Sequence, residues 1–461
     1  MSDLSQIVKA YDVRGTVPDQ WDERAAEALG VAFTQVLNDT GEPGETVLIA
    51  HDMRATGPGL VAAFATGVRA AGRAVIELGL ASTDMLYYAS GALGLPGAMF
   101  TASHNPAQYN GIKMCRSGAR PIGQDSGLAD IRDRAQALLN GGARPAGPSR
   151  APLTDRRDLL PDYAAHLRKL VDLSTIRPLK VVVDAGNGMG GYTVPSVLGD
   201  AALPALPLEI VPLYFELDGT FPHHEANPLD PKNLVDLQRA VVAHSADLGL
   251  AFDGDADRCF VIDERGEPVS PSAITALVAA RELAKHPGST VIHNLITSRA
   301  VPEIIREHGG EPVVARVGHS FIKAEMARTN AIFGGEHSAH YYFRDFWFAD
   351  TGMLAAMHTL AALGEQSQPL SILASGYERY VASGEINSTV ADQAARVAEV
   401  RVAYPEAEAD ELDGLTLRFP DGAWFNLRAS NTEPLLRLNV EGPTEERMTS
   451  LRDEVLERVR R

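Results

Sequence analysis

Cysteine, tryptophan and basic residues are scarce in this chain. Its 461 residues include two cysteines and three tryptophans, and 60 acidic residues outnumber 42 basic ones, for a formal net charge of −18. Cys115 and Cys259 stand far apart without metal-ligand spacing, which argues against a disulfide framework and favours a reducing compartment. The acidic balance argues against nucleic-acid binding. A phosphate site must therefore be assembled locally, from arginines, lysines and backbone N–H groups.

Long hydrophobic runs are also missing. No stretch reaches membrane-spanning length, and the first residues lack an apolar run after a basic head, so we expect no membrane partner and a cytoplasmic protein. Apolar residues make up 45% of the chain and charged residues 22%, as in folded enzymes. At roughly 150 residues per domain, the length predicts about three or four domains.

Short apolar runs alternate with helix-like stretches over most of the chain, which predicts α/β layers with parallel strands. Strands are expected at 46–50, 74–78, 98–101, 180–184, 247–252, 290–293 and 312–316. From 374 onward the pattern changes to antiparallel strands and a final helix from Thr444. The sequence thus predicts four domains, three α/β and one smaller α+β, at 1–152, 153–262, 263–373 and 374–461.

Ser103 lies in the segment Thr101-Ala102-Ser103-His104-Asn105-Pro106, directly after a strand-like run. Pro106 restricts the residue before it to extended or turn conformations, so we expect a fixed loop that holds Ser103 outward. Alone, the segment would indicate a solvated loop serine. Asn110-Gly111 is a tight-turn signal, and a turn there would bring Lys113 back beside the loop as a proton donor or acceptor.

Three alternating aspartates follow a predicted buried strand, in Asp253-Gly254-Asp255-Ala256-Asp257-Arg258. On an extended or tightly turned backbone their carboxylates can converge on one divalent cation, as Mg²⁺ requires. A calcium loop of the helix-loop-helix type is excluded because Arg258 stands where that loop needs glycine and the flanks resemble strands. Crowded carboxylates would repel one another without a counterion, so we predict a metal site.

Gly186, Gly188 and Gly191 follow the predicted strand at 180–184 with the spacing of a dinucleotide-binding turn, and Glu209 or Glu216 could bind a ribose. A tight crossing from strand to helix explains the same glycines without a nucleotide. We favour that structural explanation and keep a nucleotide-dependent oxidoreductase as an alternative.

Two further segments concentrate polar groups. Gly335-Glu336-His337-Ser338-Ala339-His340 holds a carboxylate, a hydroxyl and two imidazoles, which suits the hydroxyls of a sugar or a metal. Arg428-Ala429-Ser430-Asn431-Thr432-Glu433-Pro434 offers a guanidinium, hydroxyls, an amide and turn N–H groups, which suits a phosphate dianion. Either segment alone is also compatible with an ordinary polar loop.

Taken in order, the segments at 101–106, 253–258, 335–340 and 428–434 resemble the four signatures of the α-D-phosphohexomutase family. The resemblance spans essentially the whole chain. The phosphomannomutase/phosphoglucomutase branch is the most similar, as supported by Ala10-Tyr-Asp-Val-Arg-Gly15 and Val317-Gly-His-Ser-Phe-Ile-Lys323. This resemblance implies three related α/β domains and a fourth domain around a central cleft.

The resemblance also implies a role for individual residues. Ser103 would be the phosphoserine, and it would share Mg²⁺ with Asp253, Asp255 and Asp257. Arg258 would steady the phosphoserine, while Lys113 and His319 would be the general acid and base. The substrate-binding residues would be Tyr11, Arg14, Glu336, Ser338, Arg428, Ser430, Asn431 and Thr432. Glu336 and Ser338 would hold sugar hydroxyls, and the last four the phosphate that does not react.

The implied reaction converts hexose 1-phosphates and 6-phosphates into each other through a hexose 1,6-bisphosphate. Ala339 stands where the family usually has glycine, and Ser82-Thr83-Asp84 where a proline-bounded turn is common. His337 is the variable residue of the sugar loop, whose sequence favours mannose and glucose phosphates over glucosamine phosphate. Phosphoglucosamine mutase remains an alternative from the same chemistry, and a noncatalytic sugar-phosphate sensor an alternative from another class.

Overall fold

The computed structural model describes residues 2–143, 154–429 and 435–461. The chain divides into two compact units. The first comprises Met1–Val269 and His340–Ser371, and the second comprises Ser270–Ala339 and Ile372–Arg461. Among the described residues, no helix is both long and apolar enough to cross a membrane. Cys115 and Cys259 are buried and form no disulfide within the described part of the chain.

The first sheet of unit one has the strand order β1-β5-β4-β2-β3-β7, with β6 beside β5. Its strands are β1 (Val13–Thr16), β2 (Thr46–His51), β3 (Ala74–Leu80), β4 (Gly97–Phe100), β5 (Tyr109–Arg116), β6 (Arg120–Pro121) and β7 (Thr154–Arg156). Strand β2 is parallel to β3 and β4, as predicted. Strand β5 is antiparallel to both β4 and β1.

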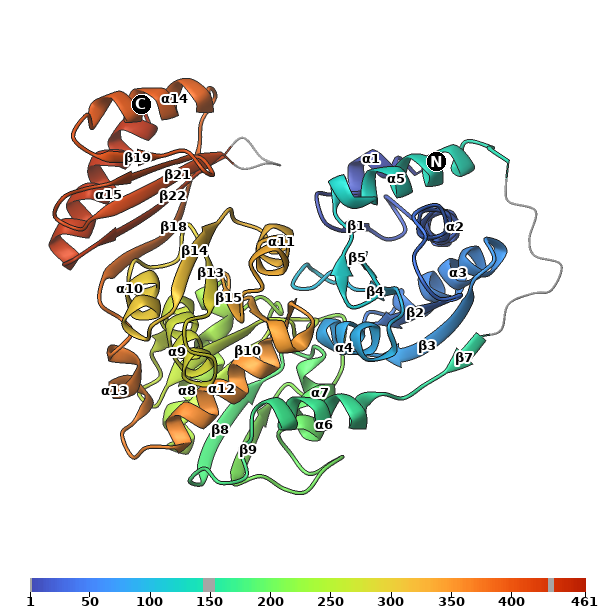
Figure 1. Cartoon of the computed structure of the whole chain (residues 1–461), viewed down its shortest axis with the longest axis horizontal. Helices are drawn as coiled ribbons and strands as arrows, with labels where there is room; N and C mark the ends of the chain where they lie inside the picture. Colours follow the sequence, from blue (N-terminus) through green and yellow to red (C-terminus); the bar gives the residue numbers. More distant parts are fainter. Residues whose placement is uncertain (1, 144–153, 430–434) are drawn as a thin grey trace. The chain divides into compact units, whose positions relative to one another are not determined.

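Helices cover both faces of this sheet (Figure 1). They are α1 (Leu4–Ile7), α2 (Glu23–Asp39), α3 (Gly57–Ala70), α4 (Thr83–Leu93) and α5 (Leu128–Leu139), with the short 3-10 helix η1 (Gln124–Ser126). Alternate residues of β2, Val47 and Ile49, pack in one core with α2, α3 and α5. Helix α4 contacts β2, β4 and β5. The short apolar run that predicted β2 therefore forms a strand buried between two packed layers.

The second sheet of unit one has the order β12-β11-β10-β8-β9. Its strands are β8 (Leu179–Asp184), β9 (Leu208–Leu213), β10 (Leu248–Phe252), β11 (Cys259–Asp263) and β12 (Pro268–Val269), with helices α6 (Leu160–Leu170), α7 (Gly190–Val197), η2 (Pro231–Leu234) and α8 (Val235–His244). The unit also holds β16 (Tyr341–Phe343), η3 (Arg344–Phe346), β17 (Ala349–Asp350) and α12 (Gly352–Gly364). The aspartate segment is the connection between β10 and β11, which pair antiparallel.

Unit two contains a parallel layer in which β13 (Thr290–Asn294) pairs with β14 (Glu311–Ala315) and β15 (Phe333–Gly335). Its helices are α9 (Pro271–Lys285), α10 (Ala300–Glu307) and α11 (His319–Thr329). Helix α13 (Leu370–Ser375) spans the point at which the chain re-enters this unit.

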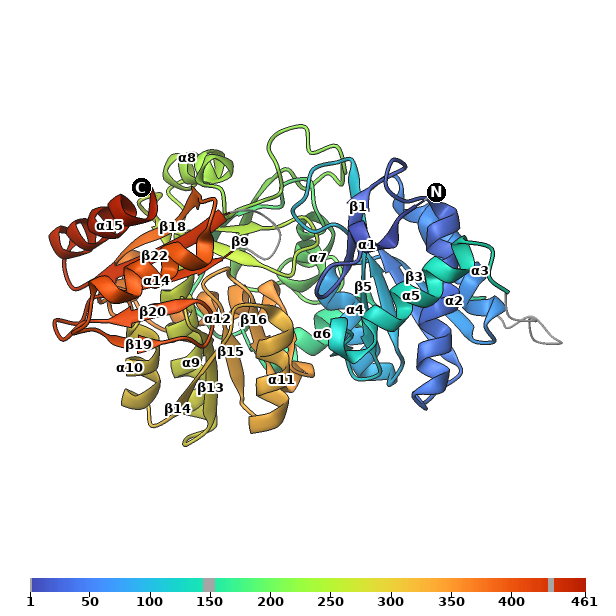
Figure 2. The ribbon, with the colours of Figure 1, turned by 90° about the horizontal axis from the view of Figure 1, so that it is seen from above.

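The last part of the chain forms an antiparallel sheet with the order β18-β22-β21-β20-β19. The strands are β18 (Val381–Thr389), β19 (Glu408–Asp410), β20 (Leu415–Arg418), β21 (Trp424–Ala429) and β22 (Leu435–Gly442). Helices α14 (Gln393–Ala403) and α15 (Glu445–Val459) pack on this sheet (Figure 2). Thr444 caps α15 by accepting a hydrogen bond from Arg447 N, so the final helix begins where the sequence predicted. The α+β character of this region is confirmed.

Candidate active site

Ser103 follows β4 in a loop that turns back into the protein. Its backbone φ is 49°, in the left-handed region, and its N–H donates to Thr101 Oγ1 over 2.9 Å. Its hydroxyl donates to Asp253 Oδ2 over 2.8 Å, and the residue is only 4% exposed. The fixed loop was predicted correctly, but the outward direction was wrong, because the Ser103 side chain is buried against the aspartate segment.

Lys113 also reaches this cluster, by a different route from the one predicted. Asn110-Gly111 lies inside strand β5 and forms no tight turn, because this stretch pairs with β1 and the pairing extends through it. The antiparallel pairing of β5 with β4 sets Lys113 opposite Met99. Lys113 Nζ lies 2.7 Å from Asp255 Oδ2 and 2.5 Å from Asp257 Oδ2.

The three aspartates converge as the sequence predicted. Asp253, Asp255 and Asp257 are buried, and one oxygen from each lies within 4.8 Å of the others. Burial raises the pKa of Asp253 to about 7, against the opposing charge of Arg258 and with the help of the neighbouring carboxylates. Burial also disfavours the charged form of Asp255, but Lys113 and the Thr83 hydroxyl outweigh it and lower the pKa of that carboxyl.

The donor set fits Mg²⁺. Oxygen Oδ1 of Asp255 and oxygen Oδ1 of Asp257 are buried and accept no hydrogen bond from any described residue. A buried carboxylate oxygen without a donor is costly, and a hard divalent cation is the partner that such oxygens prefer. The site therefore leaves two carboxylate oxygens available to a metal ion.

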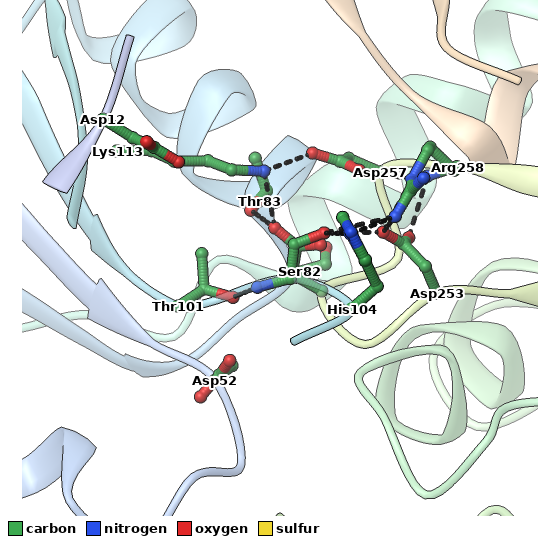
Figure 3. A network of polar contacts seen from close by, with 12 residues as sticks. Asp12, Asp52, Ser82, Thr83, Thr101, His104, Lys113, Asp253, Asp257 and Arg258 are labelled. Carbon is green, nitrogen blue, oxygen red and sulfur yellow. Dashed lines mark hydrogen bonds and ion pairs between the residues drawn. The ribbon is translucent and has the colours of Figure 1, made fainter. Parts of the chain in front are cut away.

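Arg258 connects the aspartates to the serine loop. Its Nε and Nη2 each lie 2.9 Å from Asp253 Oδ2, and its Nη2 lies 2.6 Å from His104 Nδ1 and 3.5 Å from Ser103 Oγ. Lys113 and Arg258 approach the carboxylates from different sides (Figure 3). Two cations thus surround the three carboxylates.

His104 was not assigned a role from the sequence, although it is the neighbour of Ser103 in the quoted segment. Burial and then the charge of Arg258 lower its pKa well below the usual value, so the imidazole is neutral. Because Arg258 Nη2 can only donate, His104 Nδ1 accepts, and the ring carries its proton on Nε2. Its adjacency to Ser103 was the signal that could have identified it.

Thr83, the first residue of α4, also supports the aspartates, and its neighbour Asp84 accepts hydrogen bonds from three further hydroxyls. Thr83 Oγ1 donates to Asp255 Oδ2 over 2.5 Å, and the next residue, Asp84, is fully buried. Asp84 accepts hydrogen bonds from Ser82 (2.5 Å), Tyr163 (2.6 Å) and Thr351 (2.7 Å). Where the family commonly has a proline-bounded turn, the segment Ser82-Thr83-Asp84 thus has a network of hydroxyls that is bonded to the aspartate segment through Thr83.

Arg14 lies on β1, two residues after Asp12, with Tyr11 just before the strand. Its Nη1 donates to Asn105 Oδ1 over 2.7 Å, and its Nη2 lies 2.5 Å from Asp12 Oδ2. Its Nε is buried and has no hydrogen-bond partner among the described residues. The predicted substrate-binding arginine is thus beside the serine loop, with one donor still available.

The sugar-loop residues up to Ala339 belong to unit two. Glu336 is 2% exposed, and its Oε2 accepts from Asn294 Nδ2 (3.1 Å) and Gly318 N (3.3 Å). His319, the first residue of α11, follows Gly318 directly, so the structure brings the loops of His319, Glu336 and Ser338 together. Ala339 has a φ of 63°, which explains why glycine suits this position.

His340, the last residue of the same segment, belongs to unit one. Its Nε2 lies 3.9 Å from Asp257 Oδ1, and atoms of Asp257, His340 and Asp350 lie within 4.8 Å of one another. The segment 335–340 therefore contributes residues to both units. The sequence identified this histidine as part of a polar segment but did not assign it a role.

Arg428 lies near the end of β21, and its Nη2 is 2.6 Å from Glu385 Oε2 on β18. Arg437, opposite Arg428 on β22, lies 3.3 Å from Glu385 Oε1. Two arginines therefore share one carboxylate, and the Nε of each is buried without a hydrogen-bond partner among the described residues. Arg437 was missed by the sequence analysis. Ser430, Asn431 and Thr432 lie outside the described residues.

The glycine-rich turn after β8 packs against the aspartate loop, since Met189 N donates to Gly254 O over 2.9 Å. In the same turn, Asn187 Oδ1 lies 2.9 Å from His223 Nδ1, and Asp184 Oδ2 lies 3.0 Å from His224 Nε2. Packing against this loop agrees with the structural explanation of the three glycines.

Comparison with known protein families identifies the class of enzyme to which this chain belongs. Residues 5–140, 161–266 and 270–380 match the α/β/α domains I, II and III of phosphoglucomutase/phosphomannomutase, and residues 385–458 match its C-terminal domain. A chain with these four domains is an intramolecular phosphotransferase, that is, a mutase.

Relatives narrow the assignment. A Xanthomonas campestris protein named for phosphohexose mutases is 42% identical over 438 residues, covering 94% of each chain. A Salmonella typhimurium phosphomannomutase is 40% identical over 441 residues, again covering 94% of each chain. A solved phosphoglucomutase/phosphomannomutase family protein from Burkholderia thailandensis is 32% identical with a TM-score of 0.89, covering 99% of this chain and 97% of the other. The chain belongs to the phosphoglucomutase/phosphomannomutase family and is a phosphohexomutase.

Proposed function

We propose that this phosphohexomutase interconverts mannose 1-phosphate and mannose 6-phosphate, and also the corresponding glucose phosphates, with Ser103 as the residue that carries the phosphoryl group. The observation that carries the proposal is the hydrogen bond of 2.8 Å from Ser103 Oγ to Asp253, one of three buried aspartates that converge on a single point. A phosphorylatable hydroxyl beside a divalent-cation site is the arrangement that phosphoryl transfer needs.

Each turnover has two transfers. Phosphorylated Ser103 gives its phosphoryl group to the free hydroxyl of a hexose monophosphate: that hydroxyl loses its proton to a base as its oxygen bonds phosphorus, and Ser103 Oγ takes up a proton as its bond to phosphorus breaks. The product is a hexose 1,6-bisphosphate, which reorients in the site. Ser103 Oγ then takes the other phosphoryl group, and the released sugar oxygen receives a proton. The phosphate has moved between the two ends of the sugar, and the enzyme is phosphorylated again.

Residues of the cluster have separate roles in this cycle. Lys113 is buried against Asp255 and Asp257, whose charges outweigh the effect of burial and raise its pKa, so it enters as an acid. Arg258 is positioned to neutralise charge on the serine phosphate. His319 is the proposed partner in proton transfer. The aspartates and the phosphorylated Ser103 would hold Mg²⁺, which supplies charge neutralisation when it is bound.

Substrate recognition is proposed for residues of both units. Arg14 on β1 and Tyr11 just before that strand would contact the sugar phosphate, and Glu336 and Ser338 would hold sugar hydroxyls. Arg428, Ser430, Asn431 and Thr432 would hold the phosphate that does not react, and we add Arg437 because it shares Glu385 with Arg428. The names of the relatives support mannose phosphate as a substrate, and phosphoglucosamine remains the alternative.

The proposal is tested by phosphorus NMR of mannose 1-phosphate, glucose 1-phosphate and glucosamine 1-phosphate with Mg²⁺ and a trace of glucose 1,6-bisphosphate. Wild-type enzyme should convert the first two sugars, and Ser103→Ala should convert none. Ser126→Ala is the matched control: among the described residues, the side chain of this serine bonds only to nearby Gly123, and the variant should retain wild-type turnover. Conversion of glucosamine phosphate alone would assign the alternative, and turnover by Ser103→Ala would overturn the phosphoserine.

A further inference from the structure

Arg54 lies beneath the serine loop with every donor engaged. Its side chain is 1% exposed, and its Nε lies 3.2 Å from Asp52 Oδ2. Its Nη2 donates to Ser103 O (2.9 Å) and Asn105 O (2.6 Å), and its Nη1 donates to Pro106 O (2.8 Å) and Tyr109 O (2.9 Å). A single guanidinium thus binds four backbone carbonyls of the segment 103–109.

Asp52 extends this support to the other side of the serine. Burial raises the pKa of the Asp52 carboxyl and the nearby Thr101 side chain lowers it, while Thr101 Oγ1 accepts from Ser103 N over 2.9 Å. Asp52 and Thr101 both lie close to the serine loop in Figure 3. Arg54 therefore binds the carbonyl of Ser103 directly, and its ion-pair partner Asp52 lies near Thr101, the residue that accepts from the Ser103 N–H.

Gly254, in the aspartate segment, also packs closely against the carbonyl of Ser103. A Cβ at this position would lie 2.4 Å from Ser103 O, closer than real Cβ contacts. The carbonyl of Ser103 is thus confined between the Arg54 guanidinium and the Gly254 backbone. Ser103 has a φ of 49°, a conformation that costs a non-glycine residue roughly 1–3 kcal/mol and persists only where its surroundings enforce it.

We propose that Arg54 is a positioning residue for phosphoryl transfer: with Gly254 it holds the backbone of Ser103 in the left-handed conformation that aims Oγ at the aspartate cluster. This inference rests on the proposed role of Ser103 as the phosphorylated residue. The Arg54 side chain is buried and its donors go to Asp52 and the loop carbonyls, so we expect its effect to pass through the geometry of the loop.

Lysine is the informative replacement for Arg54. It retains the positive charge opposite Asp52, but its single ammonium has three donors and lacks the planar fork that spans four carbonyls. In Arg54→Lys at least two of the five acceptors lose their partner, and the loop is free to relax. A displacement of about 1 Å at a reacting group can lower the rate about 100-fold.

Arg73 provides a matched control in the same domain. It is also a buried arginine, 5% exposed, and it bonds Asn38 Oδ1 (2.8 Å) and Glu42 O (2.9 Å), outside the serine loop. Arg73→Lys therefore reproduces the cost of placing lysine at a buried arginine site without disturbing residues 103–109.

The experiment compares wild type, Arg54→Lys and Arg73→Lys at a temperature where thermal melts show all three folded. It measures kcat and KM for mannose 1-phosphate, and the rate at which glucose 1,6-bisphosphate phosphorylates Ser103, followed by intact mass. We expect Arg54→Lys to lower kcat and the phosphorylation rate about 100-fold with KM within about threefold, and Arg73→Lys to stay within about threefold in all of them. Equal losses in the two variants, or an unchanged phosphorylation rate in Arg54→Lys, would overturn the inference.

Gly254→Ala supplies a second variant if Arg54→Lys does not fold. Its methyl group pushes on the same carbonyl from the opposite side, so the same fall in phosphorylation rate is expected, whereas Gly376→Ala, where a Cβ meets only Leu373 O at 3.4 Å, should be silent. A wild-type rate in Gly254→Ala would contradict the proposal that Arg54 and Gly254 hold the backbone of Ser103. The wild-type arm keeps the two proposals separate, because a wild-type enzyme that is never phosphorylated on Ser103 overturns the proposed function itself.

Discussion

The aspartate cluster of unit one and the arginine pair of unit two differ in the sign of the charge they leave uncompensated. In the cluster, Lys113 and Arg258 face three carboxylates, so one negative charge remains when Asp253 is ionised. In the pair, Glu385 is the one carboxylate among the described residues that forms an ion pair with Arg428 and Arg437, so one positive charge remains there. The first imbalance suits a divalent cation and the second a phosphate dianion.

The polar atoms without partners follow the same division. Counting hydrogen bonds from the described residues alone, they are carboxylate oxygens of Asp255 and Asp257 in the cluster and the Nε donors of Arg428 and Arg437 in the pair. The cluster therefore suits a cation, which the arginine pair would repel, and the pair suits an anion, which the cluster would repel. From this comparison we expect changes in the cluster to act on kcat, and changes in the arginine pair to act on KM.

The largest effect is expected from Asp257→Asn. This change removes a carboxylate that faces both Lys113 and the proposed metal, and it should lower kcat about 1000-fold, on the scale of losing a preorganised electrostatic contact. Chelation of divalent cations should cause a loss of similar size in wild type, restored by added Mg²⁺. Steady-state kinetics with mannose 1-phosphate, before and after chelation, measures both.

Asp263→Asn is the matched control for this prediction. Asp263 is also a buried carboxylate on β11, but it pairs with Arg265 in a turn away from the cluster. It should cost stability and leave kcat per folded enzyme near the wild-type value. If the two variants lose activity equally, the cluster has no special place in the reaction.

The next effect concerns Asp84, a buried carboxyl near the cluster that hydroxyls rather than cations support. Burial raises its pKa from 3.8 to about 6, although Ser82, Tyr163 and Thr351 oppose the shift. Because the folded pKa exceeds the unfolded one, the stabilising contribution is complete below about pH 4 and is lost as the pH rises through about 6. A shift of about 2 units corresponds to about 3 kcal/mol in the free energy of unfolding.

Urea unfolding of wild type and Asp84→Asn at several pH values measures this contribution. The free energy of unfolding of the variant, minus that of wild type, should rise by about 3 kcal/mol between about pH 4 and pH 7.5. Exposed Asp133→Asn should show no such rise over this interval. A difference between Asp84→Asn and wild type that does not change with pH would mean that Asp84 stays ionised, with its three hydroxyl donors outweighing burial.

A smaller effect, in the other kinetic constant, is expected in the arginine pair. Arg437→Met retains the apolar stem but leaves Arg428 alone with Glu385, so the uncompensated positive charge is lost. A hydrogen bond to a charged group contributes about 1.5–3 kcal/mol, so KM should rise about tenfold or more while kcat changes little. Arg447→Met, which breaks the ion pair with Asp421 in the same unit, should leave KM unchanged. A fall in kcat at constant KM would contradict the division between the two regions.

The sequence was sufficient where local pattern decides structure. The runs at 46–50 and 247–252 form the strands β2 and β10, because alternating or continuous apolar residues have few other ways to be buried. The aspartates converge because their spacing in a tight connection between two strands leaves the carboxylates little choice. The partnership of Ser103 with Asp253 spans distant parts of the chain, so no local pattern predicts it. It was inferred from chemistry, because a phosphorylated serine needs a cation nearby, and from the family resemblance.

Sequence reasoning failed where the partner of a residue is backbone or a distant strand. Arg54 bonds carbonyl oxygens, which every residue possesses, so no motif distinguishes it. Arg437 occupies an ordinary strand position, and its likeness to Arg428 becomes evident only when the pairing of β21 with β22 sets the two arginines opposite each other. The predicted turn at Asn110-Gly111 was wrong because Gly111 serves close packing instead: a Cβ there would lie 2.2 Å from Val13 O on the adjacent strand.

The smallest effect should come from Ala339→Gly, and it sharpens the comparison at the level of the backbone. Ser103 and Ala339 both have a positive φ, 49° and 63°, but only Ser103 is held by a guanidinium. Glycine at 339 removes a strain of roughly 1 kcal/mol and adds roughly 0.4–1 kcal/mol of unfolded-state entropy, so the free energy of unfolding should change by less than about 0.5 kcal/mol. Thermal melts and KM for mannose 1-phosphate measure the outcome. A large rise in KM would mean that Ala339, like Ser103, is held in its conformation to serve the substrate.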